Sequence, residues 1–235
     1  MMFQKKMIEL SSSKRINVYV PNHQNSETLL IYVLDGEKLT SRLLHIFQNY
    51  PDTQQPVFVS LSGENRLREY TPWPAPALSE RFESFGGEGD AFVAWLTQEL
   101  KPCVENQLLQ QPASTRSLLL GYSLGGLLAV YASFLTDAFS IVISISGSFW
   151  YPEWDTFVQN HIPASPYTGY LMLCGRKEGT KKKNLQKNAL ERTVLTHQCL
   201  CQHTDIFPLL IDEGGHHDQL NERLEKAAAW IRKKY

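Results

Sequence analysis

One serine stands in a pattern that suits nucleophilic chemistry. Ser123 lies between Gly121 and Gly125 in G-Y-S-L-G, which is a G-x-S-x-G pattern. The leucine-rich run 117–120 precedes it and an apolar segment of helical spacing, 124–136, follows, which is the strand–turn–helix context that exposes such a serine. The flanking glycines remove side chains that would collide with the neighbouring strand and helix. The pattern alone fits a structural glycine turn as well, but its context predicts that Ser123 is a nucleophile.

A serine hydroxyl is a poor nucleophile near neutral pH, so this prediction requires a base later in the chain. The last apolar run leads directly into E-G-G-H-H-D at 213–218. A glycine-rich loop at that point can bring an imidazole back over the serine. We predict His216 as the base because it directly follows Gly214 and Gly215, and the adjacent His217 is the alternative.

The third residue expected in a serine, histidine and acid triad is an acid. It should follow the predicted strand that comes before the last one. There, C-G-R-K-E-G-T at 174–180 offers Glu178. A carboxylate that accepts a hydrogen bond from the histidine Nδ1 fixes the tautomer and stabilises the imidazolium. Asp212 and Asp218 are nearer to the histidine in sequence but need an unusual loop path. If Glu178 is instead a solvated loop residue, a serine–histidine dyad remains.

Two backbone amides are expected to stabilise a developing oxyanion. The first belongs to Leu124 at the N-terminus of the predicted helix, and the second to the Gly36 region of V-L-D-G-E-K at 33–38. Loss of one such donor typically costs about 3 kcal/mol of transition-state stabilisation. Asp35 on its own fits a turn or helix-capping residue equally well.

The segments around these residues predict a doubly wound, mostly parallel sheet with helices on both faces. Runs that are apolar on both faces predict strands, and they lie at 16–20, 29–34, 57–61, 117–120, 140–145, 170–174 and 205–211. Helical spacing occupies 89–109, 124–136, 182–200 and 218–233. With the serine pattern, this order indicates an α/β-hydrolase fold. Segments 62–88 and 149–168 are expected to be loops that shape a pocket.

Composition limits the function classes. The chain has 235 residues, 43% of them hydrophobic, and a formal net charge of −1, which predicts a single domain over 1–235. Because no broad cationic field is present, nucleic-acid binding and anionic-membrane binding have no support. No apolar stretch near the N-terminus is long enough for a signal peptide, so a cytoplasmic location is expected.

The cysteines and a run of three lysines are further features that could bind a ligand. Four cysteines are too few and too unevenly spaced for a disulfide framework, and we expect reduced thiols. Cys199 and Cys201 lack the C-x-x-C spacing of common zinc sites, so neither a metal nor an organic cofactor is predicted. The run Lys181–Lys183 is typical of a solvated helix start and occasionally of an anion contact.

Six segments together resemble one known family. They are Y-V-L-D-G at 32–36, R-L-R-E-Y-T-P at 66–72, G-G-E-G-D-A-F at 86–92, G-Y-S-L-G-G at 121–126, S-G-S-F-W-Y at 146–151 and G-G-H-H at 214–217. This set resembles the putative-esterase branch of the α/β-hydrolases, which holds the enterochelin esterases and the esterase D or S-formylglutathione hydrolase group. The resemblance is greatest to the ferric siderophore esterases.

That resemblance implies hydrolysis of the ester bonds of a catecholate tri-lactone siderophore, iron-free or iron-loaded, through an acyl-enzyme on Ser123. Any iron would arrive with the substrate. The resemblance also implies that Arg66 contacts anionic or aromatic groups of the substrate. A role for Arg66 as a salt-bridged loop residue fits the sequence equally well. Trp150, Tyr151 and Trp154 are candidates for stacking on aromatic rings, with packing in the core or pocket wall as their alternative.

Three other functions stay open. A small-acyl carboxylesterase or an S-formylglutathione hydrolase-like thioesterase would use the same serine chemistry. Acyl transfer would replace water by an alcohol in deacylation. A non-catalytic binding protein of the same fold would be expected to have a broken triad, whereas Ser123, Glu178 and His216 all stand at workable positions.

Overall fold

The central feature is an eight-stranded sheet. The computed structural model describes residues 3–10, 14–22, 28–51, 55–108, 116–204 and 208–234. Within them, the strand order is β1-β2-β4-β3-β7-β8-β9-β10. The strands are β1 (Phe3–Glu9), β2 (Arg15–Pro21), β3 (Leu29–Val33), β4 (Val57–Ser60), β7 (Arg116–Tyr122), β8 (Ile141–Ile145), β9 (Gly169–Gly175) and β10 (Leu209–Asp212). In this order, the six strands from β4 to β10 are all parallel to their neighbours. Strand β2 pairs with β4, and β1 pairs with β2, both in antiparallel orientation.

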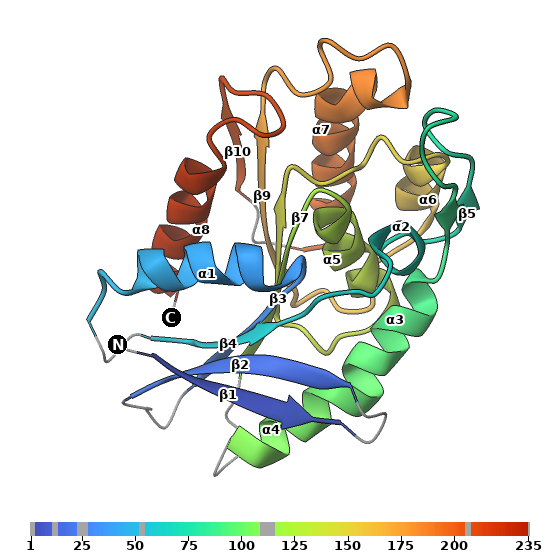
Figure 1. Ribbon diagram of the computed structural model, residues 1–235. Coiled ribbons are helices and arrows are strands. Elements are labelled where there is room, and N and C mark those ends of the chain that lie inside the picture. The colour runs from blue at the N-terminus through green and yellow to red at the C-terminus, as the bar shows by residue number, and fades with distance from the viewer. Residues whose placement is uncertain are drawn as a thin grey trace.

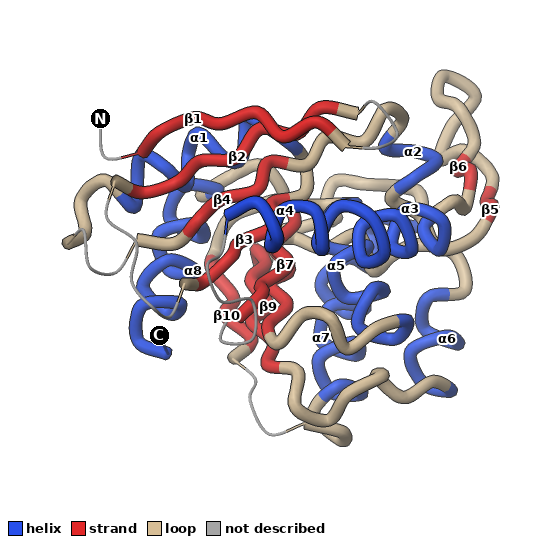
Figure 2. The backbone as a smooth tube through the Cα atoms, turned by 90° about the horizontal axis from the view of Figure 1, so that it is seen from below, coloured by secondary structure: helices blue, strands red, loops and turns tan. Residues whose placement is uncertain are grey.

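Helices cover both faces of this sheet, as Figures 1 and 2 show from two directions. On one face lie α1 (Gly36–Phe47) and α8 (Leu220–Lys234), and on the other lie α3 (Gly89–Trp95), α5 (Leu124–Leu135), α6 (Trp154–Asn160) and α7 (Ala189–Leu200). The predicted mostly parallel α/β sheet is therefore confirmed. No helix among the described residues is both long and apolar enough to cross a membrane.

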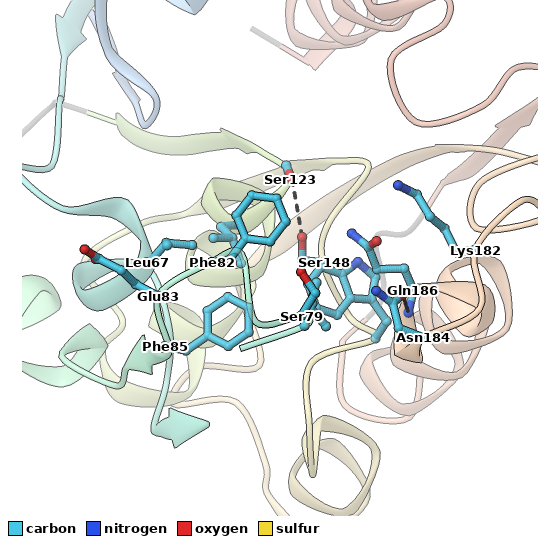
Figure 3. Close-up of a pocket in the computed structure, with 13 residues that line it drawn as sticks. Leu67, Ser79, Phe82, Glu83, Phe85, Ser123, Ser148, Lys182, Asn184 and Gln186 are labelled. Atoms are coloured by element: carbon cyan, nitrogen blue, oxygen red, sulfur yellow. Dashed lines mark hydrogen bonds between the residues drawn. The ribbon is translucent and has the colours of Figure 1, made fainter. Parts of the chain in front are cut away.

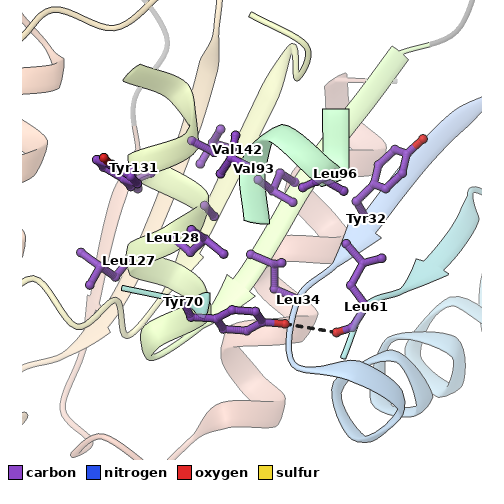
Figure 4. Close-up of a cluster of buried hydrophobic side chains, with 14 of the residues drawn as sticks. Tyr32, Leu34, Leu61, Tyr70, Val93, Leu96, Leu127, Leu128, Tyr131 and Val142 are labelled. Carbon is purple, nitrogen blue, oxygen red and sulfur yellow. Dashed lines mark hydrogen bonds between the residues drawn. The ribbon is translucent and has the colours of Figure 1, made fainter. Parts of the chain in front are cut away.

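Side chains alternate between the two faces of the sheet along each strand, so each face has its own hydrophobic core. On β3, Tyr32 packs with the residues of the α3–α5 face, whereas Ile31 and Val33 pack with those of α1 and α8. Successive strand residues point to opposite faces, so a strand that is buried on both sides must be apolar throughout. Figure 4 shows the first of these cores, in which the Tyr70 hydroxyl donates a hydrogen bond to the Leu61 carbonyl at 3.4 Å.

Several elements differ from the sequence prediction. Segment 149–168, expected to be a loop, contains α6, and segment 62–88 contains α2 (Arg66–Glu69) and a small ribbon of β5 (Pro74–Ala75) and β6 (Phe85–Gly86). Helix α1 and strand β1 were not predicted. The N-terminal part of the 205–211 strand prediction, 205–207, lies outside the described residues, as does residue 109 of the helix predicted over 89–109.

Two predicted helices have irregular parts. Between α3 and α4 (Lys101–Leu108), the wide π-helical turn Leu96–Leu100 ends two residues before Pro102, which has no N–H to donate to the carbonyl four residues earlier. The helix predicted from 182 begins later, as a 3₁₀ turn at Leu185–Asn188 followed by α7. There the Asn184 side chain accepts a hydrogen bond from the Gln186 amide, which fixes the start of the turn.

Candidate active site

Ser123 lies on a strained turn between β7 and α5. Its backbone has φ 59° and ψ −118°, a conformation that costs a residue with a side chain about 1–3 kcal/mol. A Cβ on Gly121 would come within 2.2 Å of the Gly125 backbone, and a Cβ on Gly125 within 2.3 Å of an Asp35 carboxylate oxygen. A side chain would therefore collide at both positions, with the start of the helix at Gly121 and with the Asp35 carboxylate at Gly125.

The His216 imidazole bridges the Ser123 hydroxyl and the Glu178 carboxylate. Its Nε2 lies 3.1 Å from Ser123 Oγ, and its Nδ1 lies 2.9 Å from Glu178 Oε2. Glu178 is 4% exposed, so its carboxylate cannot simply be solvated. With the proton on Nδ1, the ring donates to Glu178 and leaves Nε2 free to accept from the serine hydroxyl. The structure thus brings together the three residues that sequence reasoning selected.

The other candidates for base and acid make different contacts. The Nδ1 atom of His217 lies 2.7 Å from the Tyr122 hydroxyl, and that hydroxyl also donates to the His216 carbonyl at 3.0 Å. Asp212 accepts from the Gly214 amide, and Asp218 from the Gly215 amide, each at 2.8 Å. These two aspartates shape the turn before the histidine, and Glu178 is the carboxylate that meets the ring.

A buried arginine holds this turn from the far side. Arg223 of α8 is 1% exposed and donates two hydrogen bonds to Asp212, with Nε–Oδ2 at 2.6 Å and Nη2–Oδ1 at 2.9 Å. Its Nη1 donates to Ser146 Oγ at 2.7 Å and to Glu178 Oε1 at 3.2 Å. Nη2 also donates to the Gly215 carbonyl at 3.0 Å. One side chain therefore fixes both the acid and the loop that carries His216.

These contacts keep both carboxylates ionised. Burial alone would raise the pKa of Glu178, but its hydrogen bond and charge interaction with His216 and the Gly175 amide hold that pKa below the usual value. Burial likewise opposes ionisation of Asp212, whose pKa is held low by its bonds to Arg223 and the Gly214 amide. An ionised Glu178 is the form that stabilises a protonated His216.

The expected oxyanion donors lie at the starts of two helices. Leu124 is the first residue of α5, and Gly36, at φ +69°, is the first residue of α1. Asp35, which precedes Gly36, is also left-handed at φ 76° and makes no side-chain cap for its helix. Its carboxylate instead accepts from the Tyr122 amide at 2.9 Å, so the turn at Asp35 lies against the Ser123 turn. The donor roles of Leu124 and Gly36 remain predictions.

Arg66 is salt-bridged, as one of the two sequence interpretations had it. Its guanidinium pairs with the Asp35 carboxylate and lies over the Tyr70 ring at 5.5 Å. Burial raises the pKa of Asp35, while the Arg66 charge and the Tyr122 amide lower it. With 43% of its side chain exposed, Arg66 also lines a hollow of about 420 Å³ together with Lys38, Arg42 and His217. Arg66 is thus both paired and accessible.

A separate cavity of about 330 Å³ opens directly beside Ser123 (Figure 3). Trp150, 8% exposed, forms part of its wall with Leu67 and Phe85. Trp154, by contrast, is buried between α5 and α6, and its indole donates to Thr196 Oγ1 at 2.8 Å. Tyr151 is buried against Trp73 and Phe85. These two aromatics therefore pack in the core, which was the alternative to stacking on a substrate. Trp150 lines the cavity, and its contact with a substrate stays a prediction.

Sequence reasoning gave no role to Ser148 or Arg223. The Ser148 amide donates to the Ser123 carbonyl at 3.0 Å, and the two hydroxyl oxygens lie 3.3 Å apart. In the sequence, Ser148 could have been noticed as a polar residue between Gly147 and the aromatic run that follows it. The signal for Arg223 was a cation at a core-facing position of an amphipathic helix.

The side chain types that bind metals do not gather into a ligand set in the described part of the chain. Among the described residues, no three His, Cys, Asp or Glu side chains are grouped so that they could hold a metal ion. The four cysteines are free thiols, and burial raises the pKa of Cys174 to about 12. These residues offer no ligand set for a metal beside Ser123.

A mostly parallel sheet covered on both faces, with a serine on a strained turn after a central strand, defines an α/β-hydrolase fold. The chain belongs to the family described as putative esterase, which it matches over residues 9–234, and it is an ester hydrolase. It is 30% identical to the uncharacterized protein YbbA of Bacillus subtilis (strain 168), over 94% of this chain and 93% of that protein.

Two siderophore-processing proteins are also similar to it. The siderophore enterobactin esterase of Emericella nidulans is 27% identical over 131 residues, a match that covers 55% of this chain and 39% of that protein. The siderophore hydrolase EstA from Aspergillus nidulans has the same fold with a TM-score of 0.73, at 17% identity and with coverage of 99% of this chain and 95% of that chain.

Proposed function

We propose that this protein hydrolyses ester bonds through a covalent acyl-enzyme on Ser123, with His216 as general base and Glu178 as the acid that orients it. The observation that carries the proposal is the His216 ring, which lies within hydrogen-bond distance of both Ser123 Oγ at 3.1 Å and Glu178 Oε2 at 2.9 Å. This arrangement is what a serine hydroxyl requires to become nucleophilic at neutral pH.

In the first half of the reaction, Ser123 Oγ attacks the ester carbonyl and its proton passes to His216 Nε2. The carbonyl oxygen becomes an oxyanion, for which the Leu124 amide and an amide of the Gly36 region are the proposed donors. The carbon–oxygen bond of the ester then breaks, and the leaving alkoxide takes the proton from His216. An acyl group is left on Ser123.

The second half reverses these roles with water. His216 removes a proton from a water molecule, which attacks the acyl carbonyl, and the same proton returns to Ser123 Oγ as the acid departs. Glu178 stays ionised through both halves because hydrogen bonds from Arg223 and His216 stabilise its carboxylate form. Its contribution is to fix the ring orientation and to stabilise each imidazolium that forms.

The proposed substrate is a catecholate tri-lactone siderophore, iron-free or iron-loaded. Two similar proteins carry siderophore esterase or hydrolase names, which supports this class. The cavity beside Ser123, about 330 Å³ in volume, suits one acyl arm, with Trp150 as an aromatic wall. The hollow of about 420 Å³ that Arg66, Lys38 and Arg42 line offers cations to other, anionic parts of such a molecule.

The test compares four substrates with wild type and Ser123→Ala. They are the tri-lactone with and without iron, a short-chain para-nitrophenyl ester and S-formylglutathione. We expect Ser123→Ala to lower kcat by more than about 10³-fold on each hydrolysed substrate while the fold is retained. Mass spectrometry of the wild type during turnover should show an acyl adduct on Ser123.

The outcomes separate the candidate functions. Opening of the lactone much faster than the small esters supports a siderophore esterase. Activity confined to the small substrates identifies a small-acyl carboxylesterase or thioesterase and overturns the siderophore substrate alone. Full activity in Ser123→Ala, with a folded protein, overturns the proposed nucleophile.

A further inference from the structure

The segment between Glu178 and α7 forms a wall of the cavity beside Ser123. Gly179 has φ +77°, and a Cβ there would lie 2.0 Å from the Gln186 carbonyl, so the two ends of this segment lie against each other. The Lys182 amide donates to the Gly179 carbonyl at 2.9 Å, which tightens the turn further. Gly179, which directly follows the proposed acid Glu178, therefore anchors the part of the wall on which Lys182 stands.

Lys182 is the middle residue of the basic run, and it alone of the three lysines lines this cavity with Ser123 and Ser148. Figure 3 shows its ammonium end directed toward the Ser123 side of the cavity. The positive charge of Lys182, after burial and His216, is also among the causes that lower the pKa of His217. All three lysines are exposed, but only the Lys182 ammonium is directed toward Ser123 in this cavity, because Lys181 and Lys183 are not among its lining residues.

The charge of Lys182 is not neutralised within the described part of the chain. No carboxylate among those residues forms an ion pair with it, in contrast to Arg66 and Arg68, which pair with Asp35 and Glu88. The cavity has one carboxylate in its lining, Glu83, which Figure 3 places on the opposite side. Glu83 is near enough to Arg68 for its charge to contribute to the raised pKa of that arginine.

The remaining lining is apolar on one side and polar on the other. Leu67, Phe82 and Phe85 face Asn184 and Gln186 across the cavity, with Lys182 on the polar side. A flat apolar or aromatic group fits the first wall, and an anionic substituent on that group meets an exposed ammonium that no carboxylate of the described residues pairs with. A neutral substituent at the same place would gain a hydrogen bond but no charge interaction.

We propose that Lys182 is a specificity-determining residue, which favours esters whose acyl part carries a negative charge over neutral esters of the same shape. This inference rests on the proposed function, because it places the acyl group in the cavity that Ser123 borders. A charge pair about 6 Å apart near a solvated surface is worth roughly fivefold in kcat/KM.

The experiment uses two isosteric substrates, para-nitrophenyl para-carboxybenzoate and para-nitrophenyl para-carbamoylbenzoate. The quantity measured is the ratio of their kcat/KM values, because effects on chemistry common to both substrates cancel. We expect Lys182→Met to lower this ratio about fivefold, and Lys182→Glu to lower it about 25-fold because the charge is reversed. The matched controls Lys181→Met and Lys183→Met remove the same charge from the same run and should keep the wild-type ratio.

Two further measurements make the proposal specific. Glu83→Gln removes the opposing charge and should raise the ratio, and about 1 M salt should reduce the difference between wild type and Lys182→Met. An unchanged ratio in Lys182→Met overturns the proposal, and so does an equal fall in the Lys181 and Lys183 controls. If the wild type hydrolyses neither ester nor any other ester tested, the proposed function itself fails; hydrolysis with an unchanged ratio removes only the role of Lys182.

Discussion

His216 and His217 differ in the atoms that their rings reach. His216 Nε2 lies 3.1 Å from Ser123 Oγ, whereas His217 Nδ1 lies 2.7 Å from the Tyr122 hydroxyl. The sequence favoured His216 because of the two glycines before it, but spacing alone could not direct two adjacent rings. Their directions are set by Arg223 and Tyr122, which bind the Gly215 and His216 carbonyls, and neither contact follows from periodicity.

Replacing each histidine by glutamine tests this assignment. We expect His216→Gln to lower kcat by about 10³-fold or more, because the serine loses its base. His217→Gln should cost less than about tenfold, since that ring contacts the Tyr122 hydroxyl rather than the serine. The measurement is kcat on a short-chain para-nitrophenyl ester at saturating concentration, with circular dichroism to confirm folding. The reverse order of losses would make His217 the base.

Two of the missed elements, β1 and α6, have an incomplete burial pattern. Strand β1 has two buried residues, Phe3 and Ile8, because it lies at the sheet edge with one neighbour. Helix α6 has seven residues and buries two of them, so its signal was lost among the loop residues around it. Helix α1 had a usable signal, since Leu39, Leu43 and Ile46 are spaced for one face, and this spacing could have been found.

Helix α8 was predicted from its apolar spacing, but its most informative residue is polar. Arg223 joins α8 to the ends of β8, β9 and β10 through Ser146, Glu178 and Asp212. The partners are 77, 45 and 11 residues away in sequence. Such a contact requires the three-dimensional strand order, which an apolar pattern does not contain.

Arg223→Met should therefore destabilise the protein by about 3–5 kcal/mol, because two buried carboxylates lose their shared cation. The control is Lys226→Met, which removes a positive charge from an exposed position of the same helix and should cost less than about 0.5 kcal/mol. Urea unfolding at neutral pH measures both free energies. Equal stability of the two variants would show that the Arg223 contacts contribute no net stability.

Across the molecule, parallel strands bring distant segments to one edge of the sheet. Ser123 follows β7, Glu178 follows β9 and His216 follows β10, so the carboxyl ends of these strands deliver all three residues to the same place. This convergence explains why the order serine, acid, histidine was enough to select them. The pairing of Arg66 with Asp35 and the inward direction of Lys182 depend on loops, whose paths the sequence pattern does not fix.

The stability of the whole chain should depend on pH through Glu178 and Asp212. The pKa values of both are lower in the folded protein than usual, despite burial, because of His216 and Arg223. A carboxyl group of this kind binds fewer protons when folded, so its contribution is complete above its unfolded pKa, about 4, and is lost as pH falls through the folded value.

We expect the contribution of these two carboxylates to the free energy of unfolding to be constant between about pH 7 and pH 5 and to fall below about pH 4. Urea unfolding over a pH series measures this dependence. Glu178→Gln should be less stable at neutral pH but should show a smaller acid-induced loss, because one of the two titrating groups is gone. Glu191→Gln, at an exposed position of α7, should retain the wild-type dependence. If Glu178→Gln and wild type lose stability equally below pH 4, the buried carboxylate is not what links folding to acid.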